Sequence, residues 1–474
     1  MRELGDDFYN LTDLFTYSNP EFHERVRMKL TTNGISEYIH HYKIVAKKDG
    51  GKTLVLPRGG VLKVKQYYEY KKIPYRVTNN MIELDPIDVE LINTKIEFQQ
   101  DDIVNALIEN TGGLIEASPG LGKTVGILYL ISRVKQPVLI LVHEHRLRTQ
   151  WEQEIKLRLG GTYKFGRFDG DKKIMGDVCI GLIQTVHKMV DADPLFLHKF
   201  GMLVIDEVHH SPSTTFMKVL NNSPSKWRVG VTGTVERKDG KHILMYDTLG
   251  EVIKKISEHE VKHRITTFET EVVNTNLKIE LPSCMRWTGR KKEAQVSITE
   301  AITLLTQNPE RNSMILKNVV DNISSGYLPL IISDRTEHSK HMYNHLTELG
   351  FKCVMLIGAT RKKTKWEEVR KDKTIQCVIA QSSIASEGLD YPSLSALHLT
   401  CPSSNLPKLK QKIGRIRRVC KGKKTPIVYD YVDNLAYYID SNGAPQYVLK
   451  GGAIKRIKFY KQLQNDYGDD ESSD

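Results

Sequence analysis

The sequence has no apolar run long enough to span a membrane, and its amino-terminal segment, Met-Arg-Glu-Leu-Gly-Asp-Asp, is too polar for a secretory signal. Its six cysteines are scattered without a C-x-x-C pair, so the pattern predicts neither a zinc site nor a disulfide framework. We therefore expect a cytoplasmic protein with reduced thiols and no membrane partner. A length of 474 residues is typical of two or three domains.

Acidic residues are outnumbered by basic ones, and the formal net charge is +12. Such an excess favours a polyanionic partner, among which nucleic acid ranks before a membrane surface. Charge alone does not identify that partner, so the inference about function depends on the sequence motifs.

A phosphate-binding loop is predicted at residues 117–124, which read Ala-Ser-Pro-Gly-Leu-Gly-Lys-Thr. In loops of the type G-x-x-x-x-G-K-[ST], backbone N–H groups face the phosphates, the lysine reaches the β and γ oxygens, and the hydroxyl binds Mg²⁺. Here Ala117 replaces the first glycine. The residues expected to bind ATP and Mg²⁺ are Ser118, Pro119, Gly120, Leu121, Gly122, Lys123 and Thr124.

A second motif, Asp206-Glu207-Val208-His209, follows the apolar run 202–205. Such a run predicts a buried parallel strand, whose end would place Asp206 beside the metal ion and Glu207, as the catalytic carboxylate, near the attacking water. The alternative is a chance glycine turn and an unrelated acidic turn. The spacing of the two motifs and their flanking strands favours an ATPase.

Apolar strands alternate with helix-length segments twice along the chain, in residues 91–258 and 259–455. This alternation of strands and helices predicts an α/β fold of two tandem lobes, each with a doubly wound parallel sheet. The second lobe has no phosphate loop, so we expect it to complete the site of the first. The predicted strands are Leu114–Ala117, Val138–Val142, Val178–Ile183, Leu203–Ile205, Val229–Thr232, Leu328–Ser333, Cys353–Ile357, Cys377–Ala380, Ala396–Thr400 and Ile427–Tyr431.

The two ends of the chain carry no nucleotide motif. Residues 1–90 predict a small α+β domain, and its helix-like segment Val61–Lys72 mixes lysines with tyrosines. That mixture suits phosphate contact and base stacking, or equally a solvated helix face whose tyrosines pack on a sheet. Residues 456–474 change from basic to acidic and predict a disordered tail. The strands expected in the first domain are Tyr42–Ala46, Thr53–Leu56 and Tyr75–Val77.

In their order, the motifs resemble those of superfamily 2 DExH helicases over roughly residues 95–435. The resemblance implies two RecA-like lobes that use ATP and Mg²⁺. It includes Phe98-Gln99 as an adenine-reading Q motif, Val142–Trp151 as motif Ia, Gln184-Thr185 as a DNA-contacting segment, Val231–Thr234 as a coupling motif, Ile331–Arg335 as motif IV, Ser386–Asp390 as motif V and Gln411–Arg418 as motif VI.

Motif VI implies a role for the second lobe in ATP hydrolysis. An arginine that arrives from another lobe stabilises the charge on the γ-phosphate only when the lobes close. By resemblance Arg415 and Arg418 are such arginine fingers, and Gln411 helps to position the water. A basic helix that contacts nucleic acid is the alternative, and both roles fit this segment. By resemblance, the nucleotide site also includes Glu387, Gly388 and Asp390 of motif V.

Nucleic acid lying across both lobes would contact mainly polar side chains. Most such contacts go to phosphates and carry little sequence information. For each residue an ordinary surface or capping role is the alternative. The resemblance implies contacts from Arg146, Gln184, Thr185, Ser333, Arg335 and Ser383.

Within the superfamily the sequence most resembles XPB-like DNA helicases and phage branch-migration helicases, through residues 231–240, 246–251 and 308–312. This resemblance implies remodelling of forked or branched DNA in replication, recombination and repair, by a monomer on DNA, in the host cytoplasm if a phage encodes it. Two alternatives remain: an RNA helicase, and a nucleotide-binding DNA scaffold without unwinding activity. The complete set of predicted ATP-site residues argues against the scaffold.

Overall fold

The computed structural model describes residues 6–468 except 29, 49, 118–121, 171, 209–213, 234–239, 241, 257–259, 261–264, 289–290, 359–368, 370–371, 387–388 and 390. It divides into two compact units, one of residues 1–118 and 122–256 and the other mainly of residues 257–474. Within the described part of the chain, no helix is long and apolar enough to cross a membrane.

The first unit is built on an eight-stranded sheet in the order β10-β9-β11-β7-β12-β13-β6-β14. All neighbours are parallel except β10 and β9. The α/β fold and the five strands expected here are confirmed, because their apolar runs are buried on both faces as in a parallel sheet. The strands are β6 (Gly112–Ala117), β7 (Val138–Val142), β9 (Phe165–Asp169), β10 (Lys172–Ile174), β11 (Val178–Leu182), β12 (Met202–Asp206), β13 (Trp227–Thr232) and β14 (Val252–Ile256).

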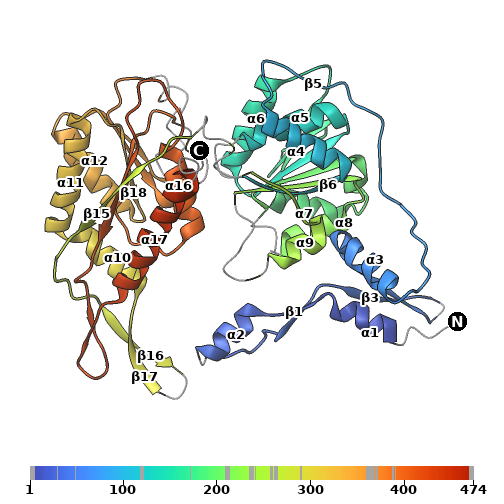
Figure 1. Cartoon of the computed structure of the whole chain (residues 1–474), viewed down its shortest axis with the longest axis horizontal. Coiled ribbons are helices and arrows are strands. Elements are labelled where there is room, and N and C mark those ends of the chain that lie inside the picture. Colours follow the sequence, from blue (N-terminus) through green and yellow to red (C-terminus); the bar gives the residue numbers. More distant parts are fainter. Residues whose placement is uncertain are drawn as a thin grey trace, which may run out of the picture. The chain divides into compact units, whose positions relative to one another are not determined.

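Two layers of helices cover this sheet. Helices α4, α5 and α6 form one layer, and α7, α8 and α9 form the other (Figure 1). Under the second layer Leu141, Ile205, Phe216 and Met245 belong to one buried cluster. The helices are α4 (Phe98–Glu109), α5 (Lys123–Val134), α6 (His145–Arg158), α7 (Ile183–Ala192), α8 (Thr214–Asn222) and α9 (Ile243–Leu249), with the 3₁₀ helix η2 (Phe196–Lys199) and the short strand pair β5 (Glu90–Leu91) and β8 (Leu159–Gly160).

The described residues of the amino-terminal segment form two small two-stranded sheets, three α-helices and a 3₁₀ helix. The strand expected at Tyr75–Val77 is wrong: these residues pair with no strand, because a β-prone run needs a neighbouring edge to bond to. The elements are α1 (Asp6–Asp13), β1 (Thr16–Ser18), α2 (Pro20–Arg27), β2 (Tyr38–His40), β3 (Lys43–Ala46), β4 (Lys52–Val55), the 3₁₀ helix η1 (Arg58–Gly60) and α3 (Val61–Tyr70).

This segment is joined to the first lobe around the buried carboxylate of Asp247 in α9. Tyr17 donates to it at 2.7 Å, Lys63 at 2.6 Å, and the ring of His41 lies 3.1 Å away. Nearby, Arg58 donates to the backbone oxygens of residues 225 and 226. The four residues come from the amino-terminal segment and their partners from the first lobe, so the two belong to one compact unit.

The second unit has a six-stranded parallel sheet in the order β15-β22-β21-β18-β20-β19. The five strands predicted here are confirmed, and β15 is an additional edge strand. Helices α11 and α12 cover one face, whereas α15, α16 and α17 pack on the other (Figure 1). The elements are β15 (Glu269–Asn274), β16 (Ser283–Thr288), β17 (Lys291–Val296), α10 (Ile298–Gln307), α11 (Pro309–Ser324), β18 (Pro329–Ser333), α12 (Thr336–Glu348), β19 (Cys353–Leu356), β20 (Cys377–Gln381), α15 (Ser382–Ser386), β21 (Ala396–Leu399), α16 (Leu406–Ile416), β22 (Ile427–Val432), β23 (Tyr438–Ile439), β24 (Pro445–Gln446) and α17 (Val448–Gly468).

The disordered tail expected from residue 456 is wrong as far as residue 468, because α17 continues to Gly468. Arg456 and Tyr460 are buried on the sheet, and both donate hydrogen bonds to the carboxylate of Asp430. The charge pattern was misleading because the arginine of this segment, Arg456, is the buried partner of an acid 26 residues earlier in the chain.

Candidate functional site

The end of the predicted phosphate loop lies at the start of α5. Gly122 has a φ of 76°, a left-handed conformation that glycine adopts without strain, and it caps the helix that Lys123 begins. The ammonium nitrogen of Lys123 is buried and makes no hydrogen bond within the described residues. It lies 3.7 Å from Oε1 of Glu207. A buried cation at a helix amino terminus fits a phosphate group. The loop residues Ser118, Pro119, Gly120 and Leu121 lie outside the described residues.

Asp206 ends β12, and its carboxylate is held on both sides. Oδ1 accepts the backbone N–H of Glu207 at 2.9 Å, and Oδ2 accepts the indole N–H of Trp151 at 2.8 Å. Burial and the Glu207 carboxylate raise the pKa of Asp206, against the opposing effects of Lys123 and Trp151. Together with the half-buried Thr124 in α5, Asp206 offers the oxygen ligands that Mg²⁺ prefers.

Glu207 has a φ of 51° although it is not glycine. A left-handed conformation costs an L-residue roughly 1–2 kcal/mol, and such strain clusters at functional sites. On the neighbouring strand β13, Val231 is paired with Asp206, so the coupling motif begins beside the acids. Thr232 of that motif is buried, and Thr234 lies outside the described residues.

The predicted Q motif lies at the start of α4. Phe98 is 80% exposed, and Gln99 is half-buried. The next residue, Gln100, was missed by the sequence analysis: it is buried, and its amide donates to the backbone oxygen of Gly122 at 3.4 Å. Gln100 also completes a capping box with Glu97, and the pattern Glu-x-x-Gln could have revealed it.

In the second unit, α16 carries most of motif VI. Gln411 and Arg415 are buried, and Nε of Arg415 donates to the backbone oxygen of Ala385 in α15 at 3.2 Å. Arg418 follows the helix and is half-buried. Its backbone forms an isolated antiparallel β-bridge with Ile265. The roles of these residues in hydrolysis stay predictions. Of motif V, Glu387, Gly388 and Asp390 lie outside the described residues.

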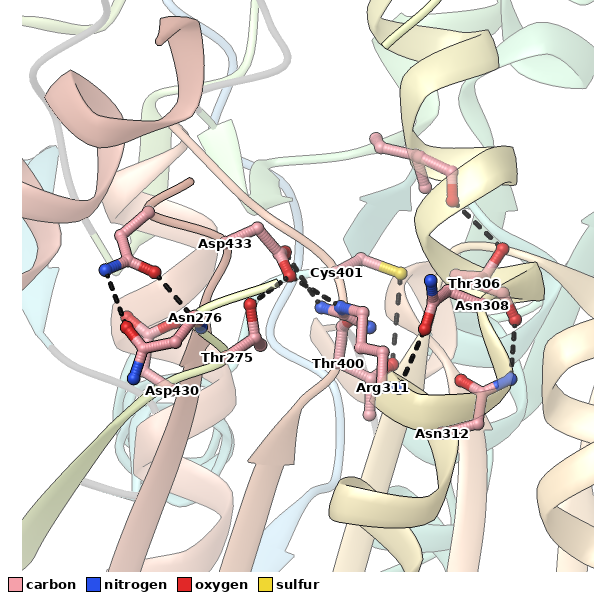
Figure 2. A network of polar contacts seen from close by, with 12 residues as sticks. Thr275, Asn276, Thr306, Asn308, Arg311, Asn312, Thr400, Cys401, Asp430 and Asp433 are labelled. Carbon is pink, nitrogen blue, oxygen red and sulfur yellow. Dashed lines mark hydrogen bonds and ion pairs between the residues drawn. The ribbon is translucent and has the colours of Figure 1, made fainter. Parts of the chain in front are cut away.

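A buried ion pair supports the loop that leads into α16. Arg311 of α11, which has no exposed surface, donates to both oxygens of Asp433 at 2.8 and 3.1 Å and to the backbone oxygen of Thr400 at 2.8 Å (Figure 2). Thr275 donates to the same carboxylate. Arg311 therefore ties the ends of β21 and β22 together, a role that the sequence did not reveal.

The candidate nucleic-acid contacts differ in their exposure. Gln184 and Ser383 are exposed, and Arg146 is half-buried. Thr185, half-buried, accepts the backbone N–H of Gly170 at 3.2 Å.

Two candidates in motif IV have internal partners. Ser333 has no exposed surface, and its hydroxyl forms hydrogen bonds with the backbone of Arg335 and with the ring of His338. In this structure its side chain is therefore not accessible to the nucleic acid that it was expected to contact. Arg335 is half-buried and donates to the hydroxyl of Thr303 and the backbone oxygen of Thr299 on α10. Both residues therefore anchor the loop after β18.

Two protein families match the chain, one on each lobe. Residues 82–237 match the family described as the res subunit of type III restriction enzymes, and residues 311–420 match the helicase conserved C-terminal domain. A phosphate-loop lobe followed by such a domain defines an ATP-dependent helicase or translocase.

Relatives extend the similarity over both lobes. "Probable helicase D10" of Escherichia phage T5 is 28% identical, covering 85% of this chain and 85% of that protein. "Putative ATP-dependent RNA helicase L396" of Acanthamoeba polyphaga mimivirus is 26% identical, covering 83% of this chain and 75% of that protein. The "DNA 3'-5' translocase XPB2" of Sulfurisphaera tokodaii is 25% identical over 75% and 85%. The chain belongs to the superfamily 2 helicases.

One solved structure illustrates the shared fold. The type ISP restriction-modification enzyme LlaBIII bound to DNA has a TM-score of 0.53 at 15% identity, covering 78% of this chain and 30% of that one.

Proposed function

We propose that this enzyme couples ATP hydrolysis to movement along DNA and to unwinding or branch migration of forked and branched DNA in replication, recombination and repair. The similarity over both lobes to a protein named as a DNA translocase carries the proposal. The basic net charge of +12 supports a polyanionic partner. We expect the enzyme to act as a monomer on DNA in the cytoplasm.

The ATP chemistry that we propose uses the residues at the carboxyl edge of the first sheet. Lys123 binds the β and γ phosphates, while the Thr124 hydroxyl and the Asp206 carboxylate hold Mg²⁺. When bound, the ion neutralises part of the phosphate charge. Glu207 orients the attacking water. Phe98 and Gln99 read the adenine, and Gln100 supports the phosphate loop through Gly122.

The second lobe, for which we propose residues 259–455, supplies the remaining groups. Arg415 and Arg418 stabilise the charge that develops on the γ-phosphate, and Gln411 positions the water. Since these groups act only when the first lobe, residues 91–258, approaches, ATP binding and hydrolysis become a closing and opening of the two lobes. That motion advances the nucleic acid.

For residues 1–90 we propose a DNA-binding accessory domain. Lys65 in α3 and Lys71 directly after it carry positive charge, and Tyr70, the last residue of the helix, is 82% exposed. Such side chains suit contact with phosphates and bases. The Asp247 contacts support a domain that stays fixed to the first lobe, so that DNA held by one is presented to the other.

An RNA helicase is the second candidate, and the similarity to L396 favours it. Backbone-tracking lobes serve either polymer. ATP hydrolysis should therefore be compared in the presence of linear duplex DNA, single-stranded DNA, forks, four-way junctions and RNA, with Glu207→Gln as the inactive control. We expect the strongest stimulation by forks and junctions, together with migration of a mobile four-way junction. Stimulation by RNA alone would contradict the proposal.

A further inference from the structure

The indole of Trp151 contacts the acid that we assign to Mg²⁺. Trp151 belongs to α6, is only 3% exposed, and donates its ring N–H to Oδ2 of Asp206 at 2.8 Å. An indole N–H is a donor only, and it neither ionises nor accepts a hydrogen bond. The indole therefore presents a proton to the Asp206 carboxyl group whatever the pH at which the protein is folded.

The two donors on Asp206 fix the plane of its carboxylate. The peptide N–H of Glu207 occupies one acceptor position of Oδ1, and the indole occupies one of Oδ2. Each carboxylate oxygen has about two acceptor positions, so a position remains on each oxygen for a metal ion or its water. Without the indole, the peptide N–H of Glu207 would be the one hydrogen-bond donor left on this carboxylate among the described residues.

The contacts of helix α6 with the rest of the first lobe hold the indole in place. His145 and Arg148, in its first turn, contact the carboxylate of Asp169 on β9 at 3.0 and 3.1 Å. Leu147 and Ile155 of the same helix are buried in the first lobe. The ring is consequently part of a packed helix and pays little ordering entropy when the metal arrives.

We propose that Trp151 is a positioning residue, which aims the carboxylate of Asp206 at Mg²⁺ through its indole N–H. The inference rests on the proposed role of Asp206 as the metal-binding acid. Partners that orient a metal ligand typically contribute 10–100-fold to metal affinity. Trp151 appears in motif Ia of the sequence, but its partner lies 55 residues away, so only the folded chain reveals the contact.

Trp151→Phe tests the proposal, because it keeps an aromatic ring and removes the donor. The measurement is the affinity for a fluorescent, non-hydrolysable ATP analogue, with Mg²⁺ and with EDTA. The ratio of the two affinities reports the contribution of the metal ion. We expect Trp151→Phe to lower this ratio about tenfold and to leave the affinity in EDTA unchanged. An unchanged ratio in a variant with the wild-type melting temperature would overturn the proposal.

Trp227→Phe is the matched control. Trp227 is likewise buried in the first lobe, but it lies at the opposite end of the sheet, paired with Met202, and its indole N–H has no acceptor among the described residues. We expect this variant to keep the wild-type ratio. An equal fall in both variants would mean that loss of packing, and not of the hydrogen bond, lowers the ratio.

Asp206→Asn separates this inference from the proposed function. If Asp206→Asn leaves the ratio unchanged, the assignment of the metal-binding acid is wrong. If it lowers the ratio while Trp151→Phe does not, only the role of Trp151 is wrong. When both lower it, the double variant should lose no more than Asp206→Asn alone, because the indole acts through that carboxylate. Additive losses would contradict this route.

Discussion

Replacing Asp247 by alanine should release the amino-terminal segment from the first lobe. This carboxylate has no exposed surface and is contacted by Tyr17, His41 and Lys63, all from that segment. Burial raises the pKa of Asp247, but the three hydrogen bonds and the charge of Lys63 outweigh burial and leave the pKa below the ordinary carboxyl range. A depressed pKa contributes stability above the pKa of the unfolded chain and loses it only as the pH falls, so the contacts persist at neutral pH.

The expected loss is about 3 kcal/mol. Removing one partner of a buried ion pair typically costs about 3–5 kcal/mol, because the other charge is left without its partner. Lys63 is 37% exposed and can recover part of its hydration, which places the value at the lower end. At 25 °C, a loss of about 3 kcal/mol corresponds to an increase of roughly 150-fold in the population of the detached state.

Hydrogen exchange measured by mass spectrometry would report this detachment in α3 and α9. Asp191→Ala is the matched control, because Asp191 is 44% exposed and pairs with the exposed Lys218 on the surface of the same lobe. A surface pair of this kind contributes about 0–1 kcal/mol. We expect faster exchange in Asp247→Ala only. Unchanged protection of α3 in that variant, or equal losses in both, would refute the reasoning.

Further predictions concern the ATP site and pH. Lys123→Ala should weaken ATP binding, whereas Glu207→Gln should bind ATP and hydrolyse almost none; equal hydrolysis by Glu207→Gln and the wild type would exclude Glu207 as the residue that orients water. Arg418→Ala should lower kcat more than it raises KM, and an unaltered kcat would assign Arg418 to nucleic-acid binding. Burial, followed by the charges of Arg311 and His341, lowers the pKa of His338 to about 3. As the pH falls from 6.5 to about 3, only the unfolded chain binds a proton at His338. The free energy of unfolding of the second lobe should therefore fall by about 1.4 kcal/mol for each pH unit through this residue. Urea denaturation should show that this slope is absent in His338→Gln.

The parallel strands could be predicted because their sequences are uniformly apolar. Both faces of β7 and β18 are covered by helices, so the apolar runs 138–142 and 329–333 identify them without further information. The edge strand β15 escaped prediction because its sequence, Glu-Thr-Glu-Val-Val-Asn, is half exposed and mixes acids with β-branched residues. Its place is decided by pairing with β22, about 158 residues later.

Residue types at the site were predictable, but their partners were not. The phosphate loop and the two acids have chemical requirements that fix both residue type and spacing. The donors of Trp151 and Gln100 serve those motifs from other elements, and no local pattern identifies their acceptors. Ser333 shows that motif position does not predict exposure, since its hydroxyl is buried and bonds with His338 of α12.

The last helix sets a limit on how the chain can be shortened. Besides its bonds to Asp430, Arg456 donates to the backbone oxygen of Ser403, in the loop that leads into α16. Trimming the protein before residue 456 would leave an acid sealed inside the second lobe and would loosen the connection to Gln411 and Arg415. An affinity tag appended after residue 468 preserves these bonds, whereas a deletion that looks harmless from the charged sequence would disturb the loop that leads into α16.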